Sequence, residues 1–120
     1  MNIDDHDEAA QGYISYDDFT KVDIRVGEIT KSESVPKSEK LLKLEVYFGP
    51  TIGHRIILAS LAKSYDVAML PGQLVLAVVN LAPRRMMGTE SHGMILAAYR
   101  EDGKLSLATC AGVPSGTQIG

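Results

Sequence analysis

The chain has one cysteine, no tryptophan and no long apolar segment, and each absence excludes a class of protein. A lone Cys110 cannot form an internal disulfide, so we expect a reducing compartment, the cytoplasm. No apolar run reaches the roughly 18 residues that a membrane span requires. The first residues, MNIDDHDEAAQG, are acidic and lack the basic and then apolar pattern of a secretory signal. We therefore predict a cytoplasmic protein with no membrane partner.

Residues that usually carry catalysis or bind metal are few and scattered. His6, His54 and His92 have no metal-ligand spacing with one another or with Cys110. The phosphate-binding glycine motifs GxxxxGK[ST] and GxGxxG are both absent. Adjacent carboxylates fall at an expected helix start and an expected turn, where acidic residues are common. We therefore predict no catalytic residue, no metal site and no cofactor, and hence no enzyme.

The charge is distributed unevenly along the chain, whose formal net charge is −3. Residues 1–18 contain six acidic residues and no lysine or arginine, which leaves 12 basic and nine acidic residues in the remainder. The remainder is thus mildly basic, although strong nucleic-acid-binding proteins are usually more so. We interpret residues 1–12 as a flexible acidic leader and residues 13–120 as one folded domain.

Apolar and polar residues alternate in several short segments, as they do in half-buried strands. We expect five strands, in the segments KVDIRVGEI, KLLKLEVYFG, HRIILAS, QLVLAVVNL and GMILAAYR. In the first segment Gly27 interrupts the alternation, which predicts a bulge or a sharp bend there. In the second segment the inward positions are Leu42, Leu44, Val46 and Phe48.

Helix signals are short and occur twice. Ser15 precedes Asp18 by three residues, the spacing of a capping box, so we expect a helical turn at about 15–20. The other candidate is LAKSYDVAML, residues 61–70, between the third and fourth strands. Five strands with a short helix in that position, and extensions at both termini, predict an all-β, five-stranded Greek-key barrel of the OB-fold type. The number of strands alone leaves a β-sandwich open.

Three segments resemble the tRNA-binding domain of the OB-fold class: YDDFTKVDIRVGEI (16–29), SEKLLKLEVYFG (38–49) and VVNLAPRRMMGTESHGMILAA (78–98). That domain occurs at the C-terminus of many methionyl-tRNA synthetases and in small dimeric tRNA-binding proteins. The resemblance runs from about Ser15 to Gly120. Its most specific motif is Asn80-Leu81-x-Pro83, two basic residues, and then Gly88-x-x-Ser91-x-Gly93-Met94.

The resemblance implies a tRNA-binding site at the connection between the fourth and fifth strands, one of the loops with which OB-folds bind nucleic acid. The residues that it implicates are Lys40, Asn80, Arg84, Arg85, Ser91, Gly93 and Met94. We expect the two arginines to bind phosphates through their guanidinium donors. We expect Asn80 and Ser91 to hydrogen-bond phosphate or 2′-hydroxyl groups, and Met94 to offer an adaptable apolar surface. Arg25 is instead expected to pair within the sheet.

The function implied is recognition of the tRNA elbow by a homodimer assembled through its terminal segments, with an aminoacyl-tRNA synthetase as a further partner. Structured RNA is read mainly through its backbone, 2′-hydroxyls and exposed loop bases. Because Tyr47, Phe48 and Tyr99 fall within expected strands and the chain has no tryptophan, we expect no rich aromatic platform for stacking single-stranded bases.

An alternative function follows from two departures from that pattern. Met86 and Met87 stand where many family members carry a further basic residue. The FGPTIG turn (48–53) and the APRR spelling (82–85) resemble the CsaA-type export chaperones, homodimers that hold unfolded polypeptides. This alternative predicts an exposed apolar patch in place of a basic groove.

Overall fold

The computed structural model describes residues 11–120, so most of the predicted acidic leader, residues 1–10, lies outside the described residues. Within the described part, no helix has the length and apolar character needed to cross a membrane. The elements, in chain order, are α2 (Tyr16–Thr20), β1 (Ile24–Ser34), β2 (Leu42–Tyr47), α3 (Gly49–Ile52), β3 (His54–Ala59), η1 (Val67–Met69), β4 (Leu74–Val78), β5 (Arg84–Met86), β6 (Thr89–Ser91), β7 (Met94–Ile95), β8 (Ala97–Tyr99), β9 (Leu105–Leu107) and β10 (Gln118–Ile119).

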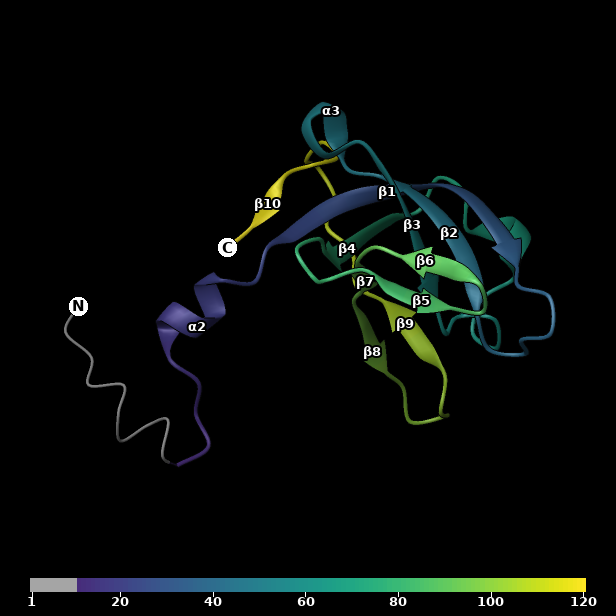
Figure 1. Cartoon of the computed structure of the whole chain (residues 1–120), viewed down its shortest axis with the longest axis horizontal. Helices are drawn as coiled ribbons and strands as arrows, with labels where there is room; N and C mark the ends of the chain where they lie inside the picture. The colour runs from purple at the N-terminus through teal and green to yellow at the C-terminus, as the bar shows by residue number, and fades with distance from the viewer. Residues whose placement is uncertain (1–10) are drawn as a thin grey trace.

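Antiparallel strands form a barrel that makes up the body of the molecule (Figure 1). The strands hydrogen-bond in the order β3-β2-β1-β4-β7, and β10 also pairs with β1. The two ends of this order, β3 and β7, are in contact, so the barrel is nearly closed. The predicted OB-fold barrel is therefore confirmed, and the β-sandwich is excluded.

The core is built on the alternation predicted for the second strand. Leu42, Leu44 and Val46 in β2 are buried, as is Phe48 just after it. They pack against buried residues of the other strands, among them Ile57 of β3. Complete burial of an apolar side chain of this size contributes about 1.5–3 kcal/mol to folding. The period-2 pattern thus fixes which face of β2 points inward.

Gly27 has a different role from the bulge that was predicted. It pairs in regular register with Val75 of β4, and the register shift lies between Ile29 and Lys31. A Cβ atom added to Gly27 would lie 2.6 Å from Phe48 Cε1 and 2.6 Å from Val46 Cγ1. The glycine breaks the alternation because the side chains of Phe48 and Val46 fill the space that a side chain at residue 27 would need.

The helical turn predicted at residues 15–20 is confirmed by α2. Ser15 caps this helix, because its Oγ accepts a hydrogen bond from the Asp18 N–H at 3.0 Å. The prediction over residues 61–70 was too long, because only the three-residue 3₁₀ helix η1 forms there. Asp66 begins η1 by accepting a hydrogen bond from Ala68 N–H at 3.0 Å, and Pro71 follows it closely. The short helix α3 was predicted as a turn; Pro50 lies in its first turn, where a missing N–H is tolerated.

The predicted fifth strand is divided between two sheets. Its first part, β7, pairs with β4, and its second part, β8, forms a hairpin with β9. Leu96 lies between them and its N–H donates to Leu76 O at 2.9 Å. The hairpin β8–β9 therefore projects from the barrel next to β7 (Figure 1).

Candidate nucleic-acid interface

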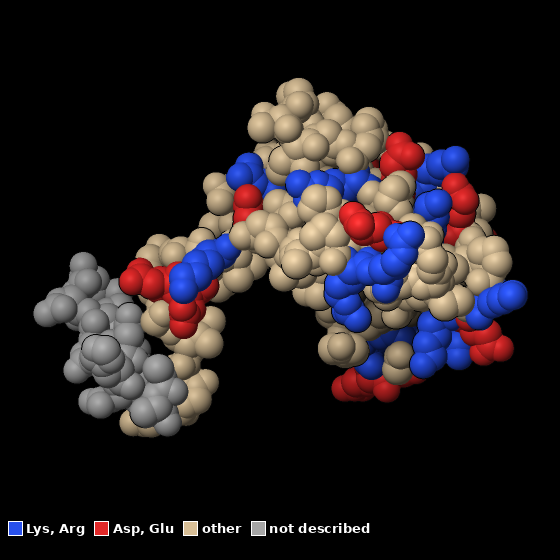
Figure 2. Space-filling model, in the orientation of Figure 1, with Lys and Arg blue, Asp and Glu red and all other residues tan. Residues whose placement is uncertain are grey.

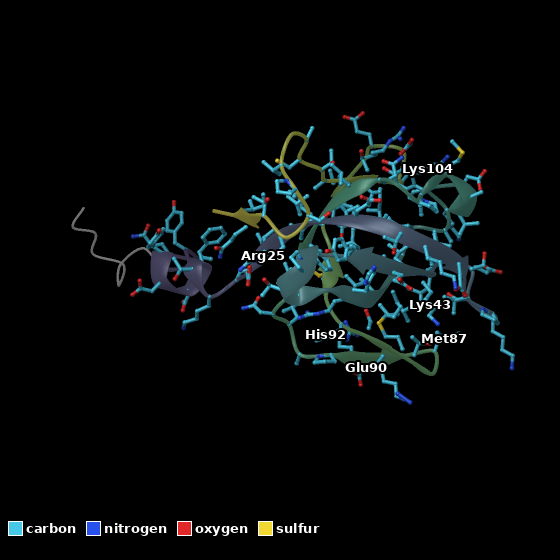
Figure 3. The ribbon with its side chains drawn as sticks, turned by 90° about the horizontal axis from the view of Figure 1, so that it is seen from above. Arg25, Lys43, Met87, Glu90, His92 and Lys104 are labelled. Atoms are coloured by element: carbon cyan, nitrogen blue, oxygen red, sulfur yellow. The ribbon has the colours of Figure 1, made fainter. Side chains whose placement is uncertain are left out.

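The polar segment between the fourth and fifth predicted strands is a hairpin, β5–β6, and not an irregular loop. Met86 pairs with Thr89, and the turn between them consists of Met87 at φ 50° and Gly88 at φ 77°. Positive φ at both central residues is typical of the type I′ turn, whose twist matches that of a hairpin. Figure 3 labels Met87 at this turn. The arginines before it therefore stand on a strand of defined geometry.

The hairpin is held against the edge of β3 by the polar residues of the motif. Leu58 N–H donates to Ser91 Oγ at 3.0 Å, and His92 N–H donates to Ile56 O at 2.8 Å. Ser91 is only 5% exposed. The hydroxyl therefore accepts a hydrogen bond that joins the hairpin to β3, and little of the residue faces solvent, while its contact with RNA stays a prediction.

Two other residues of the motif also serve the fold. A Cβ atom on Gly93 would lie 3.0 Å from Ile57 Cδ1 and 3.1 Å from Val78 O, and its φ of +128° favours glycine. Asn80 Oδ1 accepts from Asp23 N–H at 2.8 Å, and its Nδ2 donates to Lys21 O at 2.6 Å. The amide of Asn80 thus joins the end of β4 to the segment before β1, while the residue is exposed and its contact with RNA stays a prediction.

Arg84 and Arg85 have different surroundings. Arg84 pairs across the hairpin with the buried Ser91, whereas Arg85 pairs with the exposed Glu90. Since residues directly opposite each other share a face, Arg84 lies on the side toward the barrel and Arg85 on the outer side. Both are exposed, and within residues 11–120 neither forms an ion pair. Both charges are therefore free to bind an anion.

Four of the predicted residues meet in one hollow of about 110 Å³ between the hairpin and β3. They are Arg84, Ser91, Gly93 and Met94. Leu58 and Met86 complete much of the lining, and Met94 is 48% exposed. A guanidinium beside an apolar surface suits a phosphate attached to a sugar, because the charge meets the phosphate and the apolar surface meets the ribose.

Lys40 lies away from this hollow, beside a lysine that the sequence did not single out. Ala62 N–H donates to Lys40 O at 3.0 Å, which joins the β1–β2 connection to the segment after β3. Lys40 and Lys63 line a separate hollow together with Tyr99. Neither lysine forms an ion pair in the described part of the chain.

One of the three aromatic residues expected within strands is open to solvent. Phe48 is buried, and the ring of Tyr47 packs against that of His54 with centroids 4.8 Å apart. Tyr99, however, is 92% exposed. The sequence contained a signal for this exposure, because Tyr99 directly precedes the polar turn Arg100-Glu101-Asp102-Gly103. A strand residue at the end of a hairpin often lies beyond the rest of the sheet and stays uncovered.

Basic side chains gather in two places on the face of the molecule shown in Figure 2. Lysine and arginine gather over the β5–β6 hairpin and again beside the β8–β9 hairpin, where acidic side chains border them. In the part of the chain that the structure describes, no three histidine, cysteine, aspartate or glutamate side chains come together in a way that could hold a metal ion.

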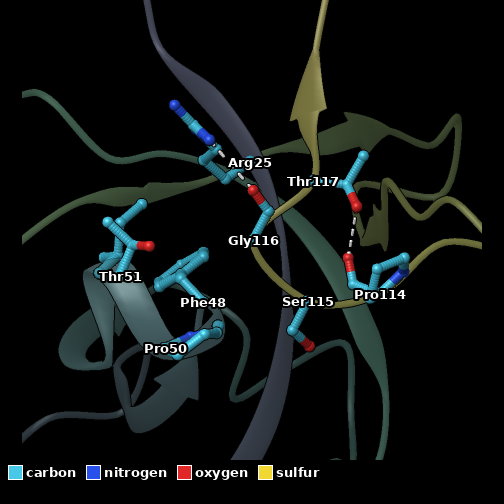
Figure 4. A pocket seen from close by; sticks show the side chains of 10 residues that line it. Arg25, Phe48, Pro50, Thr51, Pro114, Ser115, Gly116 and Thr117 are labelled. Atoms are coloured by element: carbon cyan, nitrogen blue, oxygen red, sulfur yellow. Dashed lines mark hydrogen bonds between the residues drawn. The ribbon is translucent and has the colours of Figure 1, made fainter.

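A larger cavity of about 350 Å³ lies between α3 and the C-terminal segment (Figure 4). Arg25 is the charged residue that lines it. Arg25 Nε donates to Asp23 Oδ1 at 2.7 Å and Nη1 donates to Gly116 O at 3.1 Å. The hydrogen bond with Asp23 raises the pKa of Arg25 above its ordinary value. Arg25 thus has the structural role that was expected, although its acidic partner precedes it on the chain and is not on a neighbouring strand.

The chain is similar in sequence to a known domain family and to methionine–tRNA ligases. Residues 24–118 match the model of a family described as "Putative tRNA binding domain". The chain is 43% identical over 109 residues to a methionine–tRNA ligase of Deinococcus radiodurans, and 47% identical over 96 residues to that of Archaeoglobus fulgidus. These matches cover 90% and 80% of this chain but only 16% and 14% of the ligases. The chain is thus much shorter than these relatives.

Two kinds of solved structure share the fold. A MetRS-related protein from Pyrococcus horikoshii superposes with a TM-score of 0.82 and 35% identity, covering 89% of this chain and 97% of that one. The chaperone CsaA from Picrophilus torridus superposes with a TM-score of 0.84 and 34% identity, covering 90% of this chain and 100% of that one. The chaperone CsaA from Bacillus anthracis superposes with a TM-score of 0.81 and 32% identity, covering 90% of this chain and 99% of that one.

Proposed function

Because this chain belongs to the family of putative tRNA-binding domains, related to the C-terminal domain of methionyl-tRNA synthetases, we propose that it binds tRNA and catalyses no reaction itself. The observation that carries the proposal is the hollow in which the unpaired Arg84 stands beside Met86 and Met94. A positive charge next to an apolar surface, held on a hairpin docked to the barrel, fits the backbone of a folded RNA. Phosphate contacts fix position and carry no sequence information, so the protein would recognise the shape of the RNA, and the family resemblance points to the tRNA elbow.

We further propose that the chain acts as a homodimer. Large apolar side chains on and around α2 are exposed, including Tyr13, Ile14, Tyr16 and Phe19. In Figure 1 this segment stands away from the barrel on the side where the C-terminus lies. Such a surface favours association with a second copy. Two copies would double the phosphate contacts of a mildly basic domain. Sedimentation at micromolar concentration should give about twice the 13.0 kDa of the chain.

A gel-shift competition tests the central proposal. Bulk tRNA should shift with the protein, and excess unfolded polypeptide should leave the shift intact. The affinity should fall steeply with salt, because neutralised phosphates release their counterions. If tRNA does not shift with the protein even at low salt, the proposed tRNA binding is wrong. A tRNA-binding function favours a cytoplasmic location, where we propose an aminoacyl-tRNA synthetase as a partner in trans. Co-sedimentation with a methionyl-tRNA synthetase in the presence of tRNA tests that partner.

A second candidate function is a chaperone of the CsaA type. What favours it is the similarity to two CsaA structures and the exposure of Leu81, Met87 and Met94 around the same hairpin. Exposed methionines adapt to varied apolar ligands. In the gel-shift experiment this function predicts the opposite result, with polypeptide displacing tRNA or binding alone.

A further inference from the structure

The hollow beside Arg84 is one end of a longer groove. It shares Leu58 and Met94 with a second hollow of about 260 Å³, and that one shares Ser60, Tyr99 and Leu105 with a third of about 250 Å³. We call these three together the long groove. It runs from the β5–β6 hairpin past β7 to the β8–β9 hairpin, the order in which these elements lie in Figure 1.

The charges along the long groove have one sign. Arg84 stands at the first end, and Lys40 and Lys63 stand at the other. Among the described residues, no carboxylate lines any of the three hollows. Asp102, at the nearby turn of β8–β9, forms an ion pair with Arg100 at 2.8 Å. The groove is therefore complementary to a polyanion, with an apolar floor between its two basic ends.

Tyr99 stands over this floor on a well-fixed support. It pairs directly with Leu105 across the β8–β9 hairpin, so the two side chains share a face, and Leu105 packs against the core. Ser64 Oγ accepts from Leu105 N–H at 2.9 Å, and Tyr65 Oη accepts from Leu107 N–H at 2.9 Å. These bonds tie the hairpin to the β3–β4 connection, close to Lys63. The backbone that carries Tyr99 is therefore held in place, while 92% of the residue stays open to solvent.

We propose that a single-stranded segment of RNA lies along the long groove, with one base stacked on Tyr99 and phosphates beside Arg84 and beside Lys40 and Lys63. The proposal rests on the tRNA binding proposed above and adds a second mode of contact to it. Folded tRNA has unpaired loops and an unpaired 3′ end that could supply such a segment. An exposed aromatic ring between free cations is the arrangement with which proteins bind single strands, because every base has a face that can stack.

The experiment measures affinity by fluorescence anisotropy for bulk tRNA and for a labelled oligoribonucleotide of about six nucleotides. Tyr99→Ala should weaken binding of the oligonucleotide about tenfold, while Tyr99→Phe, which keeps the ring, should stay within about twofold. The salt dependence of Tyr99→Ala should match the wild type, since stacking releases no counterion. An oligonucleotide of abasic sites should bind both proteins equally. Thermal unfolding of both variants should be unchanged, because the side chain is exposed.

Lysine variants test the basic end separately. Lys63→Ala should make the slope of log affinity against log salt shallower by about 0.7. The matched control is Lys31→Ala, which changes the charge equally but lies outside the groove, where Lys31 pairs with Glu33 at 3.2 Å. Its slope should equal that of the wild type.

Three results would overturn the proposal. If Tyr99→Ala and Lys63→Ala bind both RNAs like the wild type while Arg84→Ala loses tRNA, the groove is unused but tRNA binding stands. If the wild-type protein binds no RNA at all, both proposals fall together. If Tyr99→Ala weakens binding of an acidic unfolded polypeptide and leaves RNA unaffected, the groove is a peptide site.

Discussion

Arg84 and Arg85 are adjacent in the chain, yet their side chains leave opposite faces of the β5–β6 hairpin. Arg84 lies across from the buried Ser91 and lines a hollow, while Arg85 lies across from Glu90 and faces solvent. A pair of arginines that looks like one site in the sequence is therefore two separate charges in space.

This separation predicts unequal effects of single substitutions on tRNA binding. Arg84→Ala should weaken binding to all tRNAs by a similar factor and make the salt slope shallower by about 0.7 to 0.9, because one phosphate contact is lost. Arg85→Ala should have the smaller effect, since Arg85 lies on the face of the hairpin away from the hollow that Arg84 lines. Filter binding across a salt series measures both. Equal losses in the two variants would mean that RNA surrounds the hairpin and does not enter from the side of the barrel.

Ser91→Ala should act on stability more than on ionic contacts. It leaves the Leu58 N–H without its acceptor in a buried position, which costs about 1–3 kcal/mol. Urea unfolding gives the free energy of unfolding directly. Ser106→Ala is the control, because Ser106 is exposed on β9 and its loss should change stability by less than about 0.5 kcal/mol. Under conditions where both variants are folded, the salt slope of tRNA binding should be that of the wild type. A folded Ser91→Ala variant that binds tRNA more weakly than the wild type, with the same slope, would show that the hydroxyl also contacts RNA.

Gly27→Ala should destabilise the barrel by about 1–3 kcal/mol, because the new methyl group would overlap Phe48 and Val46 in a packed core. Urea unfolding of Gly27→Ala, Phe48→Leu and the double variant forms a thermodynamic cycle. The smaller leucine should relieve part of the overlap, so the double variant should be more stable than the sum of the two losses predicts. Additive losses would show that the barrel relaxes around the methyl group and that close approach does not explain the glycine.

The carboxyl group of Asp18 should titrate below its ordinary value of 3.8, because its hydrogen bond and charge interaction with Lys21, 3.1 Å away, lower its pKa. A pKa that is lower in the folded than in the unfolded chain stabilises the fold above the unfolded value, and this contribution is lost as the pH falls through the folded pKa. NMR titration of the side-chain carboxyl carbon measures the midpoint. Lys21→Ala should move the midpoint up toward 3.8. An unchanged midpoint in Lys21→Ala would contradict the cause assigned here.

Period-2 patterns predicted the barrel because each depends on local sequence alone. Leu42, Leu44 and Val46 repeat on one face, and a strand with that pattern can bury only that face. Ser15 predicted the start of α2 for a similar reason, since a cap is made within three residues. The helix expected over residues 61–70 was too long at its start, because Asp66 caps a helical turn that begins only at Val67, and apolar spacing does not record that.

The candidate site was only partly predictable, because motif residues serve binding and folding alike. Asn80 and Ser91 have side chains suited to RNA, and only their long-range partners, Asp23 and Leu58, reveal their use within the fold. Tyr99 was missed for the converse reason. Its place in a strand suggested burial, but the strand belongs to a hairpin that extends past the barrel.

Docking of the β5–β6 hairpin on β3 also bears on aggregation. β3 ends the hydrogen-bonded order of the main sheet, and its sequence HRIILA is apolar and rich in β-branched residues. An uncovered edge of that kind is a template on which another chain can add a strand. Ser91 and His92 occupy two of its backbone groups, the N–H of Leu58 and the carbonyl of Ile56. The hairpin that carries Arg84 therefore also covers part of the β3 edge, and Ser91→Ala should leave that edge more open to pairing with a neighbouring molecule.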